Sequence, residues 1–163
     1  MMSEKLAEQF DSDKVAAFNA GLLHDISGII PNSKRISFAE DLGITILPEE
    51  RMFPMIIHQK ISRVIANEVF NIDNQQILSA IECHTTLKGD STKFDNIVFV
   101  ADKIEWDQKG TPPYLNNILK SIDLSIYHAS YAYIKLLINQ KDNLKVVHPW
   151  LLDAYNDLTN KVN

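Results

Sequence analysis

Hydrophobic residues recur along the chain at the spacing that amphipathic helices require. Ile61, Val64, Ile65 and Val69 follow the i, i+3, i+4, i+8 pattern of a single helical face. Similar faces are formed by Ile77, Leu78 and Ile81, by Ile97, Val98, Ala101 and Ile104, and by Leu124, Tyr127, Tyr131, Ile134 and Ile138. Alternation of period two, the pattern of a half-buried strand, never persists. The fold class predicted from this pattern is all-α, with no convincing strand.

Polar residues that favour helix starts precede one further apolar pattern near the N-terminus. Ser12 and Asp13 stand before the spaced residues Val15, Phe18 and Leu22. Their side-chain oxygens can accept hydrogen bonds from the unpaired N–H groups of a first turn. We therefore expect a helix that starts at this point.

Other helix starts are indicated downstream. Asp73 and Asp123 stand where N-caps belong, and Pro149 suits a first turn because proline lacks a donor that would be unpaired there. We expect a bundle of about seven to nine helices with short connections, in one domain over residues 1–163. The stretches expected to be irregular are 27–34, 43–54, 87–93 and 106–113.

Composition and charge narrow the class of protein. The chain has 163 residues, of which 45% are hydrophobic and 23% charged, and its formal net charge is −5. This balance argues against disorder and against a broad basic surface for nucleic acid. A single cysteine, Cys83, excludes an internal disulfide and zinc sites built from several cysteines. No signal peptide or membrane-spanning run is recognisable, so we expect a cytoplasmic protein without nucleic-acid or membrane partners.

The chemistry of the chain is concentrated in its histidines and two aspartates. His24 is followed directly by Asp25, at the end of an apolar run. Adjacent helical residues point about 100° apart, so this pair can meet only at a cation that lies off the helix end. Divalent or ferric metals accept such mixed nitrogen and oxygen ligands. The alternative is a buried histidine beside an aspartate that merely ends a helix.

Three more polar residues fall at helical positions where they could join this pair. His58 opens the helix of Ile61, His84 closes the next one, and Asp102 interrupts the apolar stripe of a third. A buried carboxylate costs several kcal/mol unless it is paired or binds a metal. A helical bundle can direct such side chains from several helices into one interior metal site.

The order of these residues is similar to that of a known family. His24-Asp25, His58, His84-Thr85 and Asp102 resemble the motifs of the HD superfamily of metal-dependent phosphohydrolases. The surrounding strings resemble its YqeK-type branch, namely Gly21 to Ile26, Ile81 to Thr86, Val100 to Glu105 and Val147-His148-Pro149. That branch comprises bacterial symmetrical hydrolases of diadenosine tetraphosphate, which release two ADP molecules. The resemblance extends from about residue 14 to residue 158, nearly the whole chain.

This resemblance implies roles for individual residues. His24, Asp25 and Asp102 match metal ligands, with iron or manganese expected. Asp25, His58 and His84 match the catalytic group, in which the two histidines hold phosphates, complete a second metal position or protonate the leaving oxygen. Metal-assisted hydrolysis is the implied mechanism, with hydroxide attacking an inner phosphorus.

The resemblance also implies a nucleotide site, expected to bind ADP or GDP. Thr85 matches a donor to phosphate, and the segment around His148 matches the lining of an adenine and ribose pocket. The residues implied to contact substrate are Asp25, Ile26, Ser27, Gly28, His58, His84, Thr85, Asp102, Gln108, Val146, Val147, His148, Pro149 and Trp150. A homodimer is left open. His128 matches no motif, and Cys83 lacks an orienting third group for nucleophilic catalysis.

Three departures from the family pattern leave more than one function open. No histidine precedes His24, although the family has a first metal histidine there, upstream of the position of Met1. The family's lysine and arginine fall at Gly28 and Gln108, and only neighbouring Lys109 could replace the arginine. Such cations stabilise transferring phosphate. An active hydrolase, a nucleotide-binding protein with impaired catalysis and another HD phosphohydrolase therefore all stay open.

Overall fold

The computed structural model describes residues 1–105 and 110–162, in which every regular element is a helix. The ten α-helices are α1 (Met2–Gln9), α2 (Lys14–Leu23), α3 (Asn32–Asp41), α4 (Pro48–Met52), α5 (His58–Glu68), α6 (Gln75–Cys83), α7 (Lys93–Ile104), α8 (Leu115–Ile122), α9 (Ile126–Asn139) and α10 (Pro149–Val162). Short 3₁₀ helices cover Ile26–Ile29 and Lys141–Asn143. The all-α prediction is confirmed, since no strand occurs within the described ranges.

The helix count exceeds the predicted seven to nine because short helices lie in stretches expected to be irregular. Helix α4 spans only five residues, too few for an apolar period to show. It starts at Pro48, and the Glu50 carboxylate accepts a hydrogen bond from the Leu47 N–H (2.8 Å). Helix α3 starts at Asn32, within the stretch 27–34. Local capping, rather than a repeated apolar face, therefore specifies α4.

Two of the predicted helix caps are wrong by one or two residues. Asp13 does cap α2 as expected, because its carboxylate accepts a first-turn N–H. The cap of α6 is Asn74 rather than Asp73, and the cap of α9 is Ser125 rather than Asp123, which instead ends α8. Neighbouring side chains of similar capping ability compete at each site, and sequence alone does not distinguish between them.

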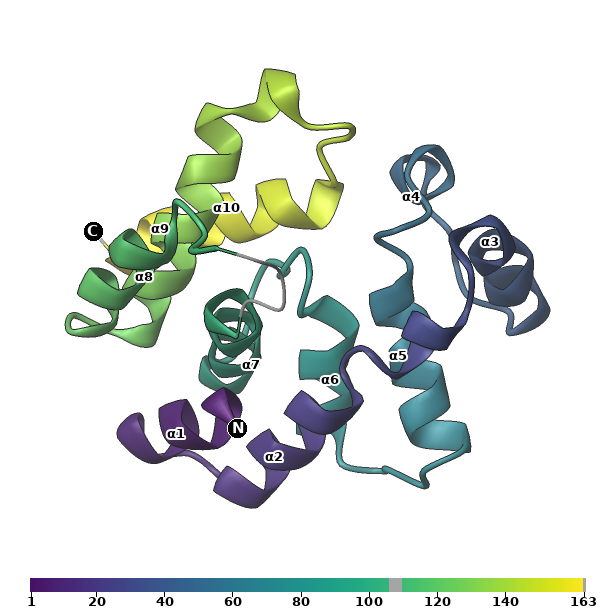
Figure 1. Ribbon diagram of the computed structural model, residues 1–163, viewed down its shortest axis with the longest axis horizontal. Coiled ribbons are helices and arrows are strands. Elements are labelled where there is room, and N and C mark those ends of the chain that lie inside the picture. The colour runs from purple at the N-terminus through teal and green to yellow at the C-terminus, as the bar shows by residue number, and fades with distance from the viewer. Residues whose placement is uncertain (106–109, 163) are drawn as a thin grey trace.

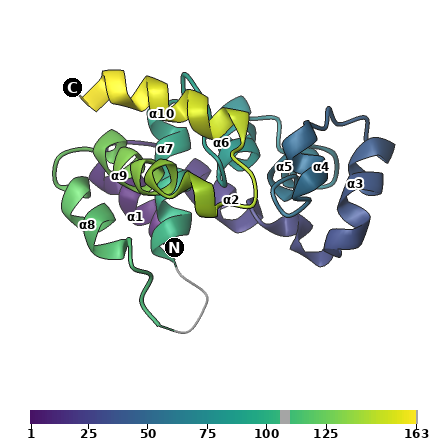
Figure 2. The same ribbon diagram turned by 90° about the horizontal axis from the view of Figure 1, so that it is seen from above.

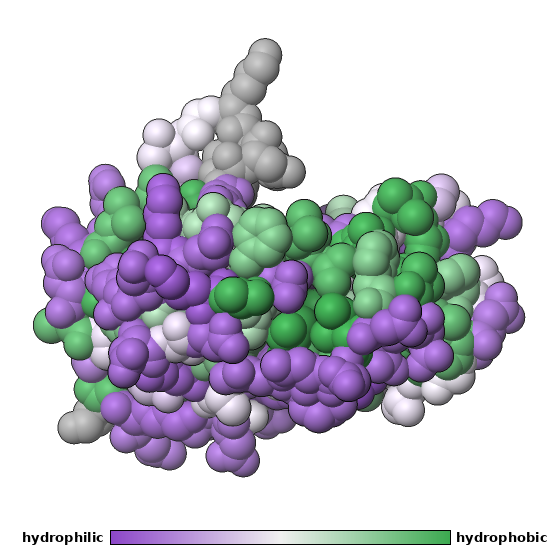
Figure 3. All heavy atoms as spheres, turned by 90° about the horizontal axis from the view of Figure 1, so that it is seen from below, coloured by the Kyte–Doolittle hydropathy of each residue, from purple (hydrophilic) through white to green (hydrophobic). Residues whose placement is uncertain are grey.

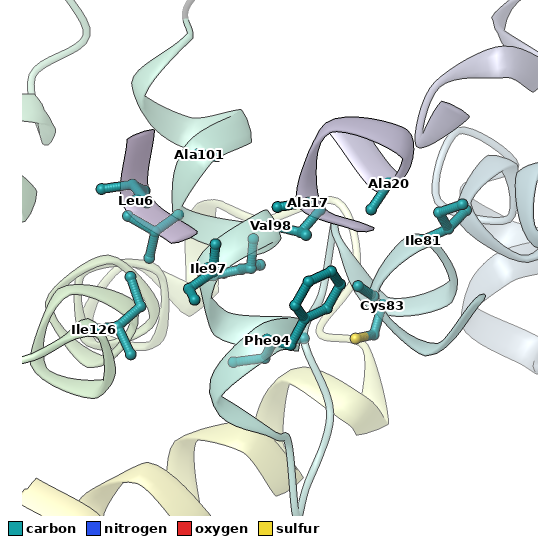
Figure 4. Packing of buried hydrophobic residues seen from close by; sticks show 14 of the residues in the cluster. Leu6, Ala17, Ala20, Ile81, Cys83, Phe94, Ile97, Val98, Ala101 and Ile126 are labelled. Atoms are coloured by element: carbon teal, nitrogen blue, oxygen red, sulfur yellow. The ribbon is translucent and has the colours of Figure 1, made fainter. Parts of the chain in front are cut away.

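Helix α7 is the centre of the main hydrophobic core (Figure 1). It packs against α1, α2, α6, α8 and α9. Figure 4 shows Phe94, Ile97 and Val98 of α7 among Leu6 of α1 and Ala17 of α2, and all five are buried. Because α7 is enclosed by these helices, a polar side chain near its C-terminal end is held in a defined position.

The apolar residues predicted for α2 face outward instead of into the core. Val15, Phe18 and Leu22 are 71%, 39% and 57% exposed. The buried face of α2 carries small residues such as Ala17 and Ala20, which allow close approach to its neighbours. Figure 3, a view of the molecule from below, shows hydrophobic residues gathered on part of the surface on that side.

No helix within residues 1–105 or 110–162 is long and apolar enough to cross a membrane.

A smaller cluster lies at the end of the molecule that carries α3, α4 and α5 (Figure 2). Its fully buried members are Ala39, Ile57 and Ile61. A buried polar group connects this end to the C-terminal segment. Glu50 of α4, which is fully buried, lies 2.9 Å from the Lys60 ammonium and 3.4 Å from His148 Nε2. The segment before α10 is thereby held against α4 and α5.

The packing of α7 leads to a stability prediction. We expect Phe94→Ala to lower the free energy of unfolding by about 3–5 kcal/mol, because a large buried ring is replaced by a cavity. Phe18→Ala, a matched change on the exposed face of α2, should lower it by no more than about 0.5 kcal/mol. Urea unfolding followed by circular dichroism measures both values. Equal losses in the two variants would contradict the assigned core.

Candidate metal centre

Three histidines at helix ends are oriented by the same kind of hydrogen bond. His24 follows α2, His58 is the first residue of α5, and His84 follows α6. In each ring Nδ1 contacts the backbone carbonyl three residues earlier, that of Gly21 (2.7 Å), Met55 (2.6 Å) or Ile81 (2.8 Å). A carbonyl can only accept, so Nδ1 carries the proton and donates it. Each Nε2 is then left with a lone pair for a cation.

The three Nε2 atoms converge on the carboxylate of Asp25. Asp25 Oδ1 lies 3.0 Å from His58 Nε2 and 3.3 Å from His84 Nε2. Its other oxygen, Oδ2, lies 3.6 Å from His24 Nε2. The Nε2 atoms of His58 and His84 are themselves 2.9 Å apart. Helices α2, α5 and α6 thus present their ends to one carboxylate.

Two further polar side chains complete the group. Asp102, near the C-terminal end of α7, places Oδ1 3.3 Å from His24 Nε2. Thr85 Oγ1 lies 3.2 Å from His58 Nε2 and 3.1 Å from His84 Nε2. The fold therefore brings together His24, Asp25 and Asp102, and the pair His58 and His84 contacts the other oxygen of Asp25.

The chemistry of these atoms fits a bound cation. Lone pairs of nitrogen and oxygen face one another at 2.9–3.6 Å, and only a shared proton or a metal ion can offset their repulsion. One atom each from His24, Asp25 and His84 lies within 4.8 Å of the others. Metal–ligand bonds of about 2.0–2.2 Å place neighbouring ligand atoms about 2.8–3.6 Å apart, which the separations between Asp25 or Asp102 and the histidines match. Mixed imidazole and carboxylate ligands suit iron or manganese.

The two carboxylates are held in their charged form. Hydrogen bonding to His58, and then to His84, keeps the pKa of Asp25 well below its usual range. Burial alone would raise the pKa of Asp102, but the charge of Lys103 and hydrogen bonding outweigh it and keep that pKa low. Both groups therefore offer ionised oxygens to a metal at neutral pH.

The histidines of the group differ in their affinity for protons. Burial lowers the pKa of His84 to about 4. Burial also acts to lower the pKa of His24, but its hydrogen bond to Asp102 outweighs this and raises it. His84 is consequently a neutral ligand at pH 7, whereas His24 has a carboxylate partner on each side.

Sequence reasoning missed Lys103. This lysine lines a cavity of about 370 Å³ together with His24, Asp25, Asp102 and Tyr133. Its side chain is only 10% exposed. The available signal was a lysine directly after Asp102 on an otherwise apolar stripe, which places a second buried charge beside the first.

A second cavity, of about 360 Å³, contains part of the predicted nucleotide site. Tyr133 lines both cavities, and Thr85, which contacts His58 and His84, lines the second. Val146 and His148 also line it, among apolar side chains that include Phe53. This cavity combines an apolar lining with a polar end at Thr85.

His148 is held by protein contacts at both ring nitrogens. It is 2% exposed, its Nε2 faces Glu50 at 3.4 Å, and its Nδ1 accepts a hydrogen bond from the Trp150 N–H (3.2 Å). Trp150 lines a different cavity, together with Lys60 and Arg63. A ligand in the second cavity can therefore meet the ring of His148 but not an unused nitrogen.

The remaining residues expected to contact substrate have varied surroundings. Ser27 is buried, and its hydroxyl donates a hydrogen bond to the carbonyl of His58 (2.9 Å), so it supports that helix start. Gly28 is exposed, and a Cβ there would meet no atom within 4 Å. Ile26, Val147 and Pro149 are partly buried. Gln108 lies outside the described residues.

His128 and Cys83 have local explanations. His128 Nδ1 contacts the hydroxyl of Ser125, the residue that caps α9. Cys83 belongs to the main core, and burial raises the pKa of its thiol. A thiol in this state is a poor nucleophile.

Comparison with known proteins gives matches over most of the chain. The model of the HD domain matches residues 1–107. The "uncharacterized protein in pepC 5′ region" of Lactococcus lactis subsp. cremoris is 49% identical over 162 residues, which cover 99% of this chain and 82% of that one. The symmetrical bis(5′-nucleosyl)-tetraphosphatase of Staphylococcus aureus is 31% identical over 146 residues, or 85% of this chain and 72% of that one.

A solved structure has the same arrangement of helices. It is the crystal structure of a predicted HD superfamily hydrolase involved in NAD metabolism from Clostridium acetobutylicum. It superposes with a TM-score of 0.89 at 25% sequence identity, over 98% of this chain and 84% of that chain.

The low pKa of His84 predicts how stability depends on pH in the metal-free protein. The folded state holds this pKa at about 4, against 6.5 for an unperturbed histidine. Between these values the unfolded chain binds a proton that the folded chain does not, so stability should fall as pH drops from 6.5 to 4. Urea unfolding with a chelator present measures this dependence.

Two histidine variants provide the control. His84→Asn keeps a donor for the Ile81 carbonyl and should show a weaker loss of stability over this pH range. His128→Asn should retain the full dependence. A profile for His84→Asn that matches the unmodified protein would show that His84 is not the group responsible.

Proposed function

The chain belongs to the HD domain family of hydrolases, as a YqeK-type member, and from this premise we propose that it hydrolyses diadenosine tetraphosphate, or a related dinucleoside polyphosphate, symmetrically to two ADP. The observation that carries the proposal is the convergence of three Nε2 lone pairs on the carboxylate of Asp25, with Asp102 beside His24. The named activity of the S. aureus relative supports the choice of substrate. We propose that residues 1–163 act as a single HD domain.

Two ligand sets that share Asp25 fit metal ions. His24, Asp25 Oδ2 and Asp102 Oδ1 would hold one ion, and Asp25 Oδ1 with His58 and His84 would hold a second. Iron and manganese suit both sets. When bound, such an ion lowers the pKa of a coordinated water toward neutrality and offsets phosphate charge.

The protein's own residues supply the remaining chemistry. The Thr85 hydroxyl, beside both His58 and His84, is placed to donate a hydrogen bond to a phosphate oxygen. Because His84 has a pKa of about 4, it is unprotonated at neutral pH and cannot act as the acid there. When the second metal position is empty, His58 Nε2 is the group left to deliver a proton to the leaving phosphate oxygen.

The second cavity suits the nucleoside. Its apolar side chains, which include Phe53, Ile56 and Val146, can pack against a planar base. Thr85 and Tyr133 border both this cavity and the metal group. A nucleotide with its base there can extend its phosphates toward Asp25.

A nucleotide-binding protein with impaired catalysis is the second candidate. It is favoured by Gly28 and Gln108, which stand where the family has a lysine and an arginine. Ground-state contacts are spread over the whole nucleotide and tolerate these losses better than groups that act in the transition state.

Asp25→Ala tests the metal role directly. We expect this variant to lose binding of Mn²⁺ and to reduce the rate of ADP release from diadenosine tetraphosphate by at least about a hundredfold. Asp123→Ala, on the exposed end of α8, should change neither. Calorimetry with Mn²⁺ and chromatographic detection of ADP measure the two effects. Unchanged Mn²⁺ affinity in Asp25→Ala would refute the assigned ligand.

His148→Ala tests the nucleoside cavity. We expect weaker ADP binding, by about tenfold, with a smaller change in turnover, because the altered side chain lines the cavity and lies apart from Asp25. His128→Ala is the matched histidine control and should bind ADP normally. If neither protein nor variant binds millimolar ADP, with or without Mn²⁺, both candidate functions are excluded.

A further inference from the structure

Lys103 places a buried cation at the edge of the metal group. Its ammonium donates hydrogen bonds to Asp102 Oδ2 and, at 3.0 Å, to the carbonyl of His84. The same nitrogen lies 4.8 Å from the ring centre of Phe99 and 5.7 Å from that of Tyr133. Two polar contacts and two aromatic faces therefore hold the charge in one place.

Within residues 1–105 and 110–162, one ammonium hydrogen of Lys103 has no hydrogen-bond acceptor. An ammonium has three hydrogens, and the described part of the chain provides hydrogen-bond partners for two of them. Lys103 also lines the cavity that contains His24, Asp25 and Asp102. A ligand in that cavity can therefore accept the third hydrogen.

The charge of Lys103 has opposite consequences for the two ligands of the proposed function. Asp25, Asp102 and Glu105 bring three negative charges to the cavity, which attract a metal cation and repel phosphate. Lys103 neutralises part of this charge, so it weakens metal binding and strengthens anion binding. It also occupies Oδ2 of Asp102, which leaves Oδ1 toward His24.

We propose that Lys103 is the anion-binding cation of this cavity, donating its third hydrogen to a non-bridging phosphate oxygen of the bound nucleotide. Its charge takes the place of the cations that are lacking at Gly28 and Gln108. The proposal rests on the proposed function, because it names a contact between this same site and the nucleotide phosphates.

The test compares Lys103→Gln with the unmodified protein. Glutamine keeps two N–H donors for Asp102 and the His84 carbonyl but removes the charge. In calorimetric titrations we expect ADP affinity, measured in the presence of Mn²⁺, to fall about tenfold. We expect affinity for Mn²⁺ alone to rise by about threefold or more. Loss of packing alone would weaken the binding of both ligands. Opposite changes in the two affinities therefore identify the charge of Lys103 as the cause.

Lys161 offers a matched control. Its ammonium also contacts a carboxylate, that of Asp157 (2.9 Å), a backbone carbonyl, that of Ser91 (3.0 Å), and an aromatic ring, that of Tyr127 (5.3 Å). Lys161→Gln should leave both affinities unchanged. Lys103→Arg, which keeps the charge, should retain ADP affinity. If Lys103→Gln does not fold, Lys103→Met replaces it, with the same pair of shifts expected.

The outcomes separate this proposal from the function on which it rests. If the unmodified protein binds both Mn²⁺ and ADP, and Lys103→Gln binds ADP equally well or binds both ligands more weakly, the role of Lys103 is overturned and the proposed function stands. If the unmodified protein binds neither ligand, both are overturned.

Discussion

A hydrogen bond from imidazole Nδ1–H to the backbone carbonyl three residues earlier is the constraint on which the candidate site depends. It occurs at His24, His58 and His84, each at a helix end, and leaves every Nε2 with a lone pair directed toward Asp25. A flip of any of these rings would place Cε1 and its hydrogen where Nε2 now faces Asp25. The ends of α2, α5 and α6 must therefore meet at one point, and the core achieves this by packing α6 against both α2 and α5.

Helix α7 links the stability of the fold to the chemistry of the site. Its apolar residues form the centre of the core, while Asp102 and Lys103 near its end bring opposite charges to the metal cavity. Burial of these two charges costs free energy, and the surrounding packing reduces this cost because it holds Asp102 and Lys103 in contact with each other. A second group of buried ionisable side chains in mutual contact lies where the smaller cluster meets the C-terminal segment. It consists of Glu50 with Lys60 and His148. Buried charges of opposite sign are therefore paired at both places.

Much of this arrangement could be predicted from sequence, because the fold class depends on apolar periodicity and the motif residues fall at helix ends that this periodicity defines. The outward face of α2 could not be predicted, since alanines there pack more closely than larger residues and so displace Val15, Phe18 and Leu22 to the surface. The contacts of Lys103 and of His148 could not be predicted from sequence either. Both depend on partners from other helices, namely the His84 carbonyl and Glu50.

The central claim, that Asp25 is the shared ligand of a metal site, is tested most directly by anomalous diffraction from crystals soaked in Mn²⁺. The account predicts an anomalous peak within bonding distance of the Asp25 carboxylate and of either His24 with Asp102 or His58 with His84. Crystals of Asp25→Ala treated in the same way should lack that peak. Saturating Mn²⁺ that leaves no peak at Asp25 in the unmodified protein, or a peak that persists unchanged in Asp25→Ala, would contradict the account.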